Sequence, residues 1–556
     1  MIITVLKKSL VLSLTCGFLF GCGGEAPMEL KMVGIDSINE ADISKHIQIL
    51  ASDEFEGRGP SSPGEVKTVN YLVDAYKKIG LKPGIEESYF QEVPLVAISP
   101  DPTTTIIISG GDGDDLSLNY NKDMMVWTTQ VQEEVSVENA EMIFVGYGII
   151  APEYSWNDYA DVDVTGKVVV VMVNDPGYAT QDDAVFNGNS MTYYGRYTYK
   201  YEEAARQGAA GVYLIHETKP AAYPWAVVTG SWAGPNFDLD PEDGNMSAVG
   251  IEAWLHVEST RKLFEKAGLD YEGLKVAAQD ANFKAVPMGL NTSITLKNKF
   301  EKSLSKNVVG ILPGSEAPDE YFLYMAHWDH LGMDPSLEGD KIYNGALDNA
   351  SGTAALLEIA EAFVSGTPPK RSLIFLAVTA EEQGLLGAAH YGANPLIPIN
   401  QTVAGLNMDG LNWFGPTKDI SVAGYGFSEL DEYVEDVAKS LGRYVTPDGE
   451  PEKGYYFRSD HFELAKNGVP MVYPGSGVDH VEFGSDYGKA QNDKYGAERY
   501  HKPNDEFDET WVLSGGVEDT KLYFMIGDTI ANSNAWPNWY EGNQFRAIRD
   551  KSLADK

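Results

Sequence analysis

Apolar residues recur with different periods along the chain, and the periods divide it into regions. In 37–50 and again in 68–79 they recur every three or four positions, which predicts two helices. Gly80 directly follows the second segment and is expected to end that helix. Residues 51–58 between them are polar and contain Gly57, which predicts a loop.

The middle of the chain, from about residue 94 to residue 298, has short β-rich runs separated by Gly, Asp and Pro. This pattern is typical of a mainly β unit. One helix is predicted in it, at 200–207, and a buried strand follows at 208–215. The other predicted strands are 104–108, 141–150 and 167–173.

After residue 299, strand-like apolar runs alternate with amphipathic segments. The predicted strands are 320–326, 372–378, 402–408 and 469–473, and the predicted helices are 350–364, 385–391 and 429–440. This alternation predicts an α/β fold with a mostly parallel sheet flanked by helices on both faces. The charged residues after Asp550 are expected to be frayed.

Possible metal ligands directly follow three of these strand runs. They are His327, Glu381, Glu382 and Asp409. Each has an ordinary explanation by itself: a core histidine, a solvated acidic pair at a helix N-terminus, or a turn aspartate. Ligands gather beyond the carboxyl ends of such strands, however, so the topology could bring all four together. We therefore expect a metal site at this edge of the sheet.

Two further aspartates lie close to these residues in the sequence. Asp329 is two residues after His327, where it could accept the second N–H of the imidazole and fix its tautomer. Asp348 lies in a Gly- and Asn-rich loop before a helix. It could bridge two metals or cap the helix, with Asn349 and Ser351 as rival capping residues. The sequence by itself leaves this choice open.

Composition narrows the possible partners and ligands. The chain has 42 Lys and Arg against 82 Asp and Glu, a net charge of -40, which disfavours nucleic acid and anionic lipid surfaces as partners. The two cysteines, Cys16 and Cys22, both lie near the N-terminus. If the chain is cut before Cys22, His, Asp and Glu must hold any metal. Such a ligand set suits a catalytic zinc site with open positions.

The N-terminus has Lys7 and Lys8, followed by an apolar run at 10–20 that is short for a membrane span. We interpret residues 1–22 as a signal peptide. Leu19-Phe20-Gly21-Cys22 resembles the bacterial lipobox, which implies lipidation of Cys22 and a location in the cell envelope. Ordinary secretion with cleavage elsewhere is the alternative.

The order of the candidate ligands resembles peptidase family M28. The family pattern is His-x-Asp, an Asp in a Gly-, Asn- and Ser-rich turn, Glu-Glu, Asp and a late His. The late histidine matches His501 in Arg499-Tyr500-His501-Lys502. Segments 53–58, 458–462 and 536–539 also look like this family, so the resemblance spans nearly the whole mature chain.

This resemblance implies a pair of zinc ions in the site. One would be held by His327 and Asp409 and the other by Glu382 and His501, and Asp348 would bridge them. Two cations about 3.5 to 4 Å apart lower the pKa of a shared water and polarise the carbonyl group that is attacked.

The resemblance also implies three catalytic roles. Glu381 would be the general base, and Asp329 would orient the imidazole next to it. Tyr500 would donate a hydrogen bond to the developing oxyanion.

The domain organisation follows from the change of pattern along the chain. Segments 166–171 and 204–212 resemble the protease-associated (PA) domain, with a plain α/β insertion as the alternative. We predict the signal peptide at 1–22, a discontinuous catalytic domain at 37–130 and 296–545, and a PA-like insertion at 131–295.

Taken together, the resemblance implies an exported zinc aminopeptidase that acts on peptides and meets the membrane only through its lipid anchor. A carboxypeptidase or dipeptidase of the same fold is an alternative. A glutaminyl cyclase would share the fold but use one zinc, and the presence of His327 and Asp348 argues against it. A non-catalytic binding module is the remaining alternative, although no expected ligand is missing from the sequence.

Overall fold

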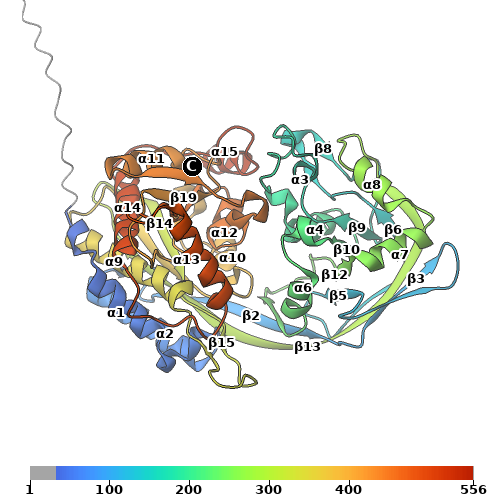
Figure 1. The fold of residues 1–556 in the computed structure, drawn as a ribbon, viewed down its shortest axis with the longest axis horizontal. Helices are drawn as coiled ribbons and strands as arrows, with labels where there is room; N and C mark the ends of the chain where they lie inside the picture. Colours follow the sequence, from blue (N-terminus) through green and yellow to red (C-terminus); the bar gives the residue numbers. More distant parts are fainter. Residues whose placement is uncertain (1–32, 555) are drawn as a thin grey trace, which may run out of the picture. The chain divides into compact units, whose positions relative to one another are not determined.

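The computed structural model describes residues 33–554 and 556 (Figure 1). The predicted signal peptide at 1–22 and its lipidation site, Cys22, lie outside the described residues. In the described part of the chain, no helix is long and apolar enough to cross a membrane.

A mixed sheet carries the strand ends that the sequence singled out. Strand β14 (Ala317–His327) lies between β17 (Arg371–Val378) and β18 (Thr402–Asn407), and the three are parallel. Strand β21 (Met471–Ser476) is parallel to β18, whereas β13 (Val286–Leu312) is antiparallel to β17. Every residue of β17 is buried, as expected for a strand covered on both faces.

Further strands complete this first sheet and its edges. They are β1 (Lys82–Pro83), β2 (Phe90–Pro100), β11 (Asn236–Leu239), β19 (Asp419–Ala423) and β20 (Tyr444–Pro447). The predicted α/β fold with a mostly parallel, mixed sheet is confirmed.

Alternate side chains of β14 face opposite layers of helices. The Tyr324 hydroxyl donates to the backbone carbonyl of Tyr523, 3.0 Å away on one face. Met325 packs on the other face in an apolar cluster. The first face is covered by α9 (Gly352–Ser365) and α14 (Ser514–Ala531), and the second by α10 (Leu386–Ala393) and α12 (His461–Lys466).

The two helices predicted near the start of the described chain are present as α1 (Glu40–Leu50) and α2 (Pro63–Ile79). Side-chain oxygens of Asn39 and Ser62 accept from the first backbone N–H groups of α1 and α2, respectively. Gly80 ends α2 with a φ of 103°, a left-handed conformation that glycine adopts without strain.

A second sheet is inserted between β2 and the end of β13. Residues 286–297 of β13 pair in this sheet and residues 298–312 pair in the first, so one long strand joins the two (Figure 1). The other strands of the second sheet are β3 (Thr105–Gly110), β4 (Leu116–Asn119), β5 (Met124–Trp127), β6 (Glu134–Phe144), β9 (Val168–Met172), β10 (Gly211–His216) and β12 (Ile251–His256).

The sheet pairing puts the start of this insertion near residue 101 rather than at residue 131. Strands β3 to β5 pair within the second sheet, whereas the predicted boundary places them in the catalytic domain. The reason is that strand composition hardly changes there, whereas partner choice depends on residues far along the chain. The helices of the insertion are α3 (Pro176–Thr180), α4 (Tyr197–Arg206), α5 (Thr218–Ala221), α6 (Trp225–Ser231), α7 (Val257–Lys266) and α8 (Tyr271–Ala277).

Two local predictions were wrong. The strand expected at 141–150 starts earlier, at Glu134, and ends at Phe144. The tail expected to be frayed forms α15 (Arg546–Ala554), because the buried Arg549 donates hydrogen bonds to the carbonyls of Thr402 and Val403. The remaining helices are α11 (Leu430–Ser440) and α13 (Ser485–Glu498).

Candidate metal centre

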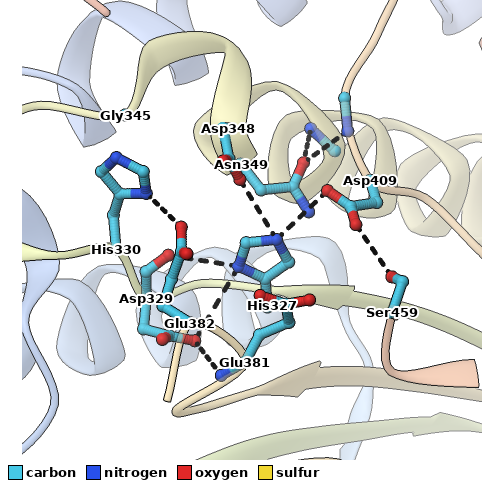
Figure 2. A network of polar contacts seen from close by, with 12 residues as sticks. His327, Asp329, His330, Gly345, Asp348, Asn349, Glu381, Glu382, Asp409 and Ser459 are labelled. Atoms are coloured by element: carbon cyan, nitrogen blue, oxygen red, sulfur yellow. Dashed lines mark hydrogen bonds and ion pairs between the residues drawn. The ribbon is translucent and has the colours of Figure 1, made fainter. Parts of the chain in front are cut away.

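The carboxyl ends of three neighbouring parallel strands meet at one edge of the first sheet. His327 is the last residue of β14, Glu381 and Glu382 follow β17, and Asp409 follows β18. Figure 2 shows the side chains of Asp348 and Asp409 turned toward His327. The strand ends therefore bring together the residues that the topology had placed at this edge.

Asp348 lies between two imidazoles. Its Oδ1 is 3.4 Å from Nε2 of His327, and its Oδ2 is 3.2 Å from Nε2 of His501. It does not cap the following helix, because Asn349 Oδ1 accepts the backbone N–H of Gly352 at 2.9 Å. The capping role is thus excluded, and both oxygens of Asp348 face the site.

The first group of possible ligands is His327, Asp409 and one oxygen of Asp348. Nε2 of His327 is 3.2 Å from Oδ1 of Asp409. The other oxygen of Asp409 accepts a 2.8 Å hydrogen bond from the Ser459 hydroxyl, which fixes the carboxylate plane (Figure 2). The sequence does not predict this contact of Ser459, because fifty residues separate it from Asp409.

The second group is Glu382, His501 and the other oxygen of Asp348. Nε2 of His501 is 2.9 Å from Oε2 of Glu382. The opposite oxygen of Glu382 is 2.5 Å from Nδ1 of His330, which is fully buried. The His330 ring packs so closely on Gly345 that a Cβ there would lie 2.5 Å from the ring, so only glycine fits.

Both groups fit a zinc ion by the chemistry and the spacing of their donors. Four ligands at about 2.0 to 2.1 Å around one zinc stand roughly 3.3 Å apart, close to the donor separations within each group, 3.2 to 3.4 Å in the first and 2.9 to 3.2 Å in the second. Combinations of these residues with Glu381 and His330 also converge closely enough to hold an ion.

The surrounding carboxylates favour positive charge in the site, as the raised pKa values of the two histidines indicate. Burial lowers the pKa of His501, but the hydrogen bonds that His501 donates to Asp348 and Glu382 outweigh it and raise that pKa to about 10. Burial also lowers the pKa of His327, yet the charges of Glu381 and Asp409 raise it well above its usual value. Metal cations would supply that charge in place of protons.

Two of the three predicted catalytic residues, Glu381 and Asp329, contact each other. Burial raises the pKa of Glu381, and the charge of Asp409 raises it further. The backbone N–H of Glu381 donates to Oδ1 of Asp329 at 3.1 Å. Asp329 Oδ1 is 3.9 Å from Nδ1 of His327, and the nearer acceptor is the Asp329 carbonyl at 3.2 Å. Asp329 therefore positions Glu381 directly, and its backbone contacts the imidazole.

Tyr500 stacks on His501, with the ring centroids 3.9 Å apart, and is 48% exposed. Burial raises the pKa of Tyr500, and the charges of Asp348 and Glu382 raise it further, so the phenol keeps its proton. A protonated phenol is a hydrogen-bond donor, as its predicted role requires.

Arg58 supports the backbone next to the site, and the sequence did not predict this role. Its buried guanidinium donates to the carbonyls of Trp328, Asn344 and Gly345 at 2.9, 2.5 and 2.7 Å. Trp328 follows the ligand His327, and Gly345 precedes the loop of Asp348. One side chain thus ties two ligand-bearing segments together.

Asp505 has a related role on the other side of the Asp348 loop. Its Oδ1 accepts the backbone N–H of Leu347 at 3.2 Å, and its Oδ2 accepts that of Asp348 at 3.1 Å. Because Asp505 is four residues after His501, it joins the loop that carries the late histidine to the loop that carries Asp348.

Comparison with known proteins relates the region around the metal centre to a peptidase family. Residues 307–525, which hold all five predicted metal ligands, match the model of peptidase family M28. This part of the chain is therefore similar to the peptidases of family M28. The M28 match covers the first sheet from the end of β13 and most of α14.

Curated relatives share short segments with the chain. Mouse aminopeptidase NAALADL1 is 36% identical over 131 residues, which is 22% of this chain and 16% of that protein. A probable zinc metalloprotease of Pyrenophora teres f. teres is 46% identical over 82 residues, 15% of this chain and 17% of that one. Aminopeptidase YwaD of Bacillus subtilis is 37% identical over 99 residues, 17% and 20% of the two chains. The chain thus spans a fifth or less of the length of these relatives.

Solved structures that resemble the chain over most of its length include an aminopeptidase from Aneurinibacillus sp. strain AM-1. The two are 18% identical, the match covers 91% of this chain and 96% of the other, and the TM-score is 0.46.

Proposed function

We propose that the chain is an exported zinc peptidase. It would use two zinc ions to release N-terminal residues from peptides. The observation that carries this proposal is the position of Asp348, whose two oxygens face two separate imidazoles. A single metal would need only one of these groups. A carboxylate shared by both is the arrangement expected of a two-metal hydrolase.

His327 and Asp409 would hold one zinc, Glu382 and His501 the other, and Asp348 both. When bound, zinc supplies a Lewis acid and lowers the pKa of water.

The chain's own residues would move the protons and stabilise the charge. Glu381 would take the proton of the attacking water and return it to the leaving amine, and Asp329 would hold the Glu381 backbone in place. Tyr500 would donate a hydrogen bond to the oxyanion, and Ser459 would keep the Asp409 carboxylate in one orientation.

The aminopeptidase form of this proposal is supported by the names of the relatives and by the charge of the site. Two of the three relatives described above are named aminopeptidases. The carboxylates around the cluster would also attract a free α-amino group. Glutaminyl cyclase is the second candidate, but the position of Asp348 between His327 and His501 favours two metals over one. Hydrolysis of aminoacyl reporters, compared with that of N-blocked peptides, separates an aminopeptidase from the carboxypeptidase alternative.

Metal analysis of the purified protein tests the two-zinc centre. We expect about two zinc per chain, and a content of one or none would contradict the proposal. The variant Glu381→Gln should lose activity by about 10²- to 10⁴-fold while it keeps its metal. Glu482→Gln, at an exposed position, is the matched control. Full activity of Glu381→Gln would exclude Glu381 as the base.

The proposal includes a lipid anchor at Cys22 and a PA-like insertion that shapes the entrance to the site. The anchor is supported by the lipobox-like sequence before Cys22. Cys22→Ser should release the protein from the membrane fraction, and continued anchoring of that variant would exclude this site.

A further inference from the structure

Helix α13 is held by very few contacts of its own. Gly488 is its only buried residue, whereas nearly all of α9, a helix of the same length, is buried. No apolar stripe runs along α13, and its sequence contains two glycines, Gly488 and Gly496. A helix of this length is only marginally stable in water without packing. The position of α13 therefore depends on what holds its two ends.

A cavity of about 220 Å³ adjoins α13. The helix lines it with Tyr487, Gln491 and Tyr495, and the rest of the lining includes Trp413, Phe414 and Val512. A helix beside a cavity lacks the van der Waals contacts that hold a helix on a packed layer. Elements with few buried contacts open at the lowest free energy. Helix α13 thus has the features of an element that opens easily.

The N-terminal end of α13 is fixed by close packing. A Cβ at Gly488 would lie 2.2 Å from the carbonyl oxygen of Val478, so only glycine lets the helix approach that backbone so closely. The ring centroid of Tyr487 lies 5.0 Å from the centroids of His480 and Phe483. This end of the helix is therefore a fixed point.

Beyond α13, the chain is fixed again at Asp505. Its backbone carbonyl accepts the N–H of Ala346 at 2.9 Å, and its carboxylate accepts the backbone N–H of Asp348 at 3.1 Å. The hydroxyl of Tyr495 donates to Oδ2 of Asp505 at 3.1 Å. Residues 485–504, here called the strap, therefore run between two fixed points.

One side chain ties the strap to the metal centre. Nε2 of His501 is 3.2 Å from Oδ2 of Asp348 and 2.9 Å from Oε2 of Glu382. Within 489–504, the described structure shows no other side chain in a hydrogen bond or ion pair with a residue outside 485–508. His501 is thus the point at which the strap can be locked or released.

The donors that meet at this point come from three segments: His501 from the strap, Glu382 from the end of β17, and Asp348 from its loop. Without a metal, an ion pair of the imidazole with these carboxylates is weakened by solvent, because His501 is 38% exposed. Bonded to one zinc, the same donors would fix the strap to both other segments.

We propose that the strap docks on the metal centre when His501, Glu382 and Asp348 bind zinc, and that it lifts when this zinc leaves. The strap also carries Tyr500, so lifting it removes the predicted oxyanion donor together with a metal ligand. The supply of zinc would then switch the peptidase on and off through this one position. The inference rests on the proposed two-zinc peptidase and describes how its site is regulated.

Hydrogen–deuterium exchange of the full chain, read by mass spectrometry, tests the strap. Removal of zinc with a chelator should speed exchange of the α13 amides about ten-fold or more, and added zinc should restore slow exchange. Helix α7 of the insertion is the internal reference and should not respond. His501→Ala should exchange rapidly at α13 with and without zinc, whereas His390→Ala in α10 should behave like the wild type. Slow exchange at α13 in the zinc-free wild type would overturn the proposal.

A second variant tests the coupling from the side of the strap. Ala490→Pro removes a helix hydrogen bond at an exposed position inside α13 and so destabilises the docked strap. Because coupling is reciprocal, the affinity for one of the two zinc ions should fall about ten-fold or more. Ala490→Ser at the same position is the control. Wild-type affinity of Ala490→Pro for both ions would overturn the coupling.

These measurements separate the strap from the peptidase proposal. A protein that binds two zinc ions and hydrolyses peptides, yet shows the same α13 exchange with and without zinc, overturns the strap alone. A protein that binds a single zinc contradicts the two-zinc proposal, but the strap stands if α13 exchange depends on that zinc and on His501.

Discussion

The two halves of the metal centre are built on different kinds of support. His327 ends a central strand, its side chain is 1% exposed, and its carbonyl accepts from the Thr353 hydroxyl at 2.8 Å. His501 lies in a loop after α13, is 38% exposed, and has a φ of 55°, which a residue with a side chain rarely adopts. The half with His327 and Asp409, here called the strand-end half, is preorganised by the sheet. The half with Glu382 and His501, the loop half, depends on a loop.

This difference predicts unequal behaviour of the two metal positions. Local opening is easier where few buried contacts hold a segment, so the loop half should release its metal more readily. Asp348 couples the halves, because each of its oxygens faces one of them.

The largest effect is expected from Asp348→Asn, which breaks both halves at once. An amide keeps the shape but has one oxygen and no negative charge. It cannot ligate two metals, so both should bind more weakly. We expect kcat/KM to fall by about 10³-fold or more and the zinc content to drop below one per chain. Activity assays and elemental analysis measure these changes, with Asp319→Asn at an exposed strand position as the control. Normal zinc content with lost activity would contradict the bridging role.

A smaller effect is expected from His501→Ala, which removes one ligand of the loop half only. The zinc content should fall from about two to about one per chain, and kcat should decrease by roughly 10²-fold. His390→Ala, on the helix α10, is the matched histidine control. Loss of both metals from His501→Ala would show that the strand-end half cannot hold its ion alone, and the comparison between the halves would fail.

Arg58→Gln should act on stability more than on the chemistry. The guanidinium donates to carbonyls beside both halves, and removing a buried charged donor leaves those carbonyls without partners. We expect the free energy of unfolding to fall by about 3 kcal/mol, measured by denaturant titration, with Arg261→Gln as the control. A loss below about 0.5 kcal/mol, the scale of an ordinary surface change, would show that Arg58 is not a structural tie.

The strand-end half could be predicted from the sequence, because each ligand there stands directly after an apolar run and parallel strands end together. The residues that support the two halves could not. Arg58, Ser459 and Asp505 contact ligand segments far away in the sequence, and no local pattern marks such contacts.

The same reason explains the errors in the fold. The insertion boundary depends on which strands β3 to β5 pair with, and pairing is a long-range choice. The helix at 546–554 forms because Arg549 meets the carbonyls of residues 402 and 403. Local polarity alone predicted a frayed tail there.

The smallest expected effect concerns the helix α9 behind the strand-end half. Glu358 in α9 is buried beside α1, with Nε2 of His46 at 3.7 Å from its Oε1. Burial raises the pKa of Glu358 to about 8, and the charges of Asp42 and Glu361 contribute to this increase. The folded state therefore holds a proton that the unfolded chain releases above its pKa of 4.5. Between these two values, stability falls as the pH rises.

Glu358→Gln should remove this dependence, because glutamine is neutral at every pH and has the same shape. At pH 8 the variant should be more stable than the wild type by about 1 to 3 kcal/mol, and near pH 5 the two should differ little. Thermal unfolding at a series of pH values measures this, with Glu498→Gln at an exposed helix position as the control. Activity per folded molecule should stay unchanged, because Glu358 supports the strand-end half without contacting its ligands. A variant that is less stable at pH 8 would mean that Glu358 is charged and favourably paired in the folded protein.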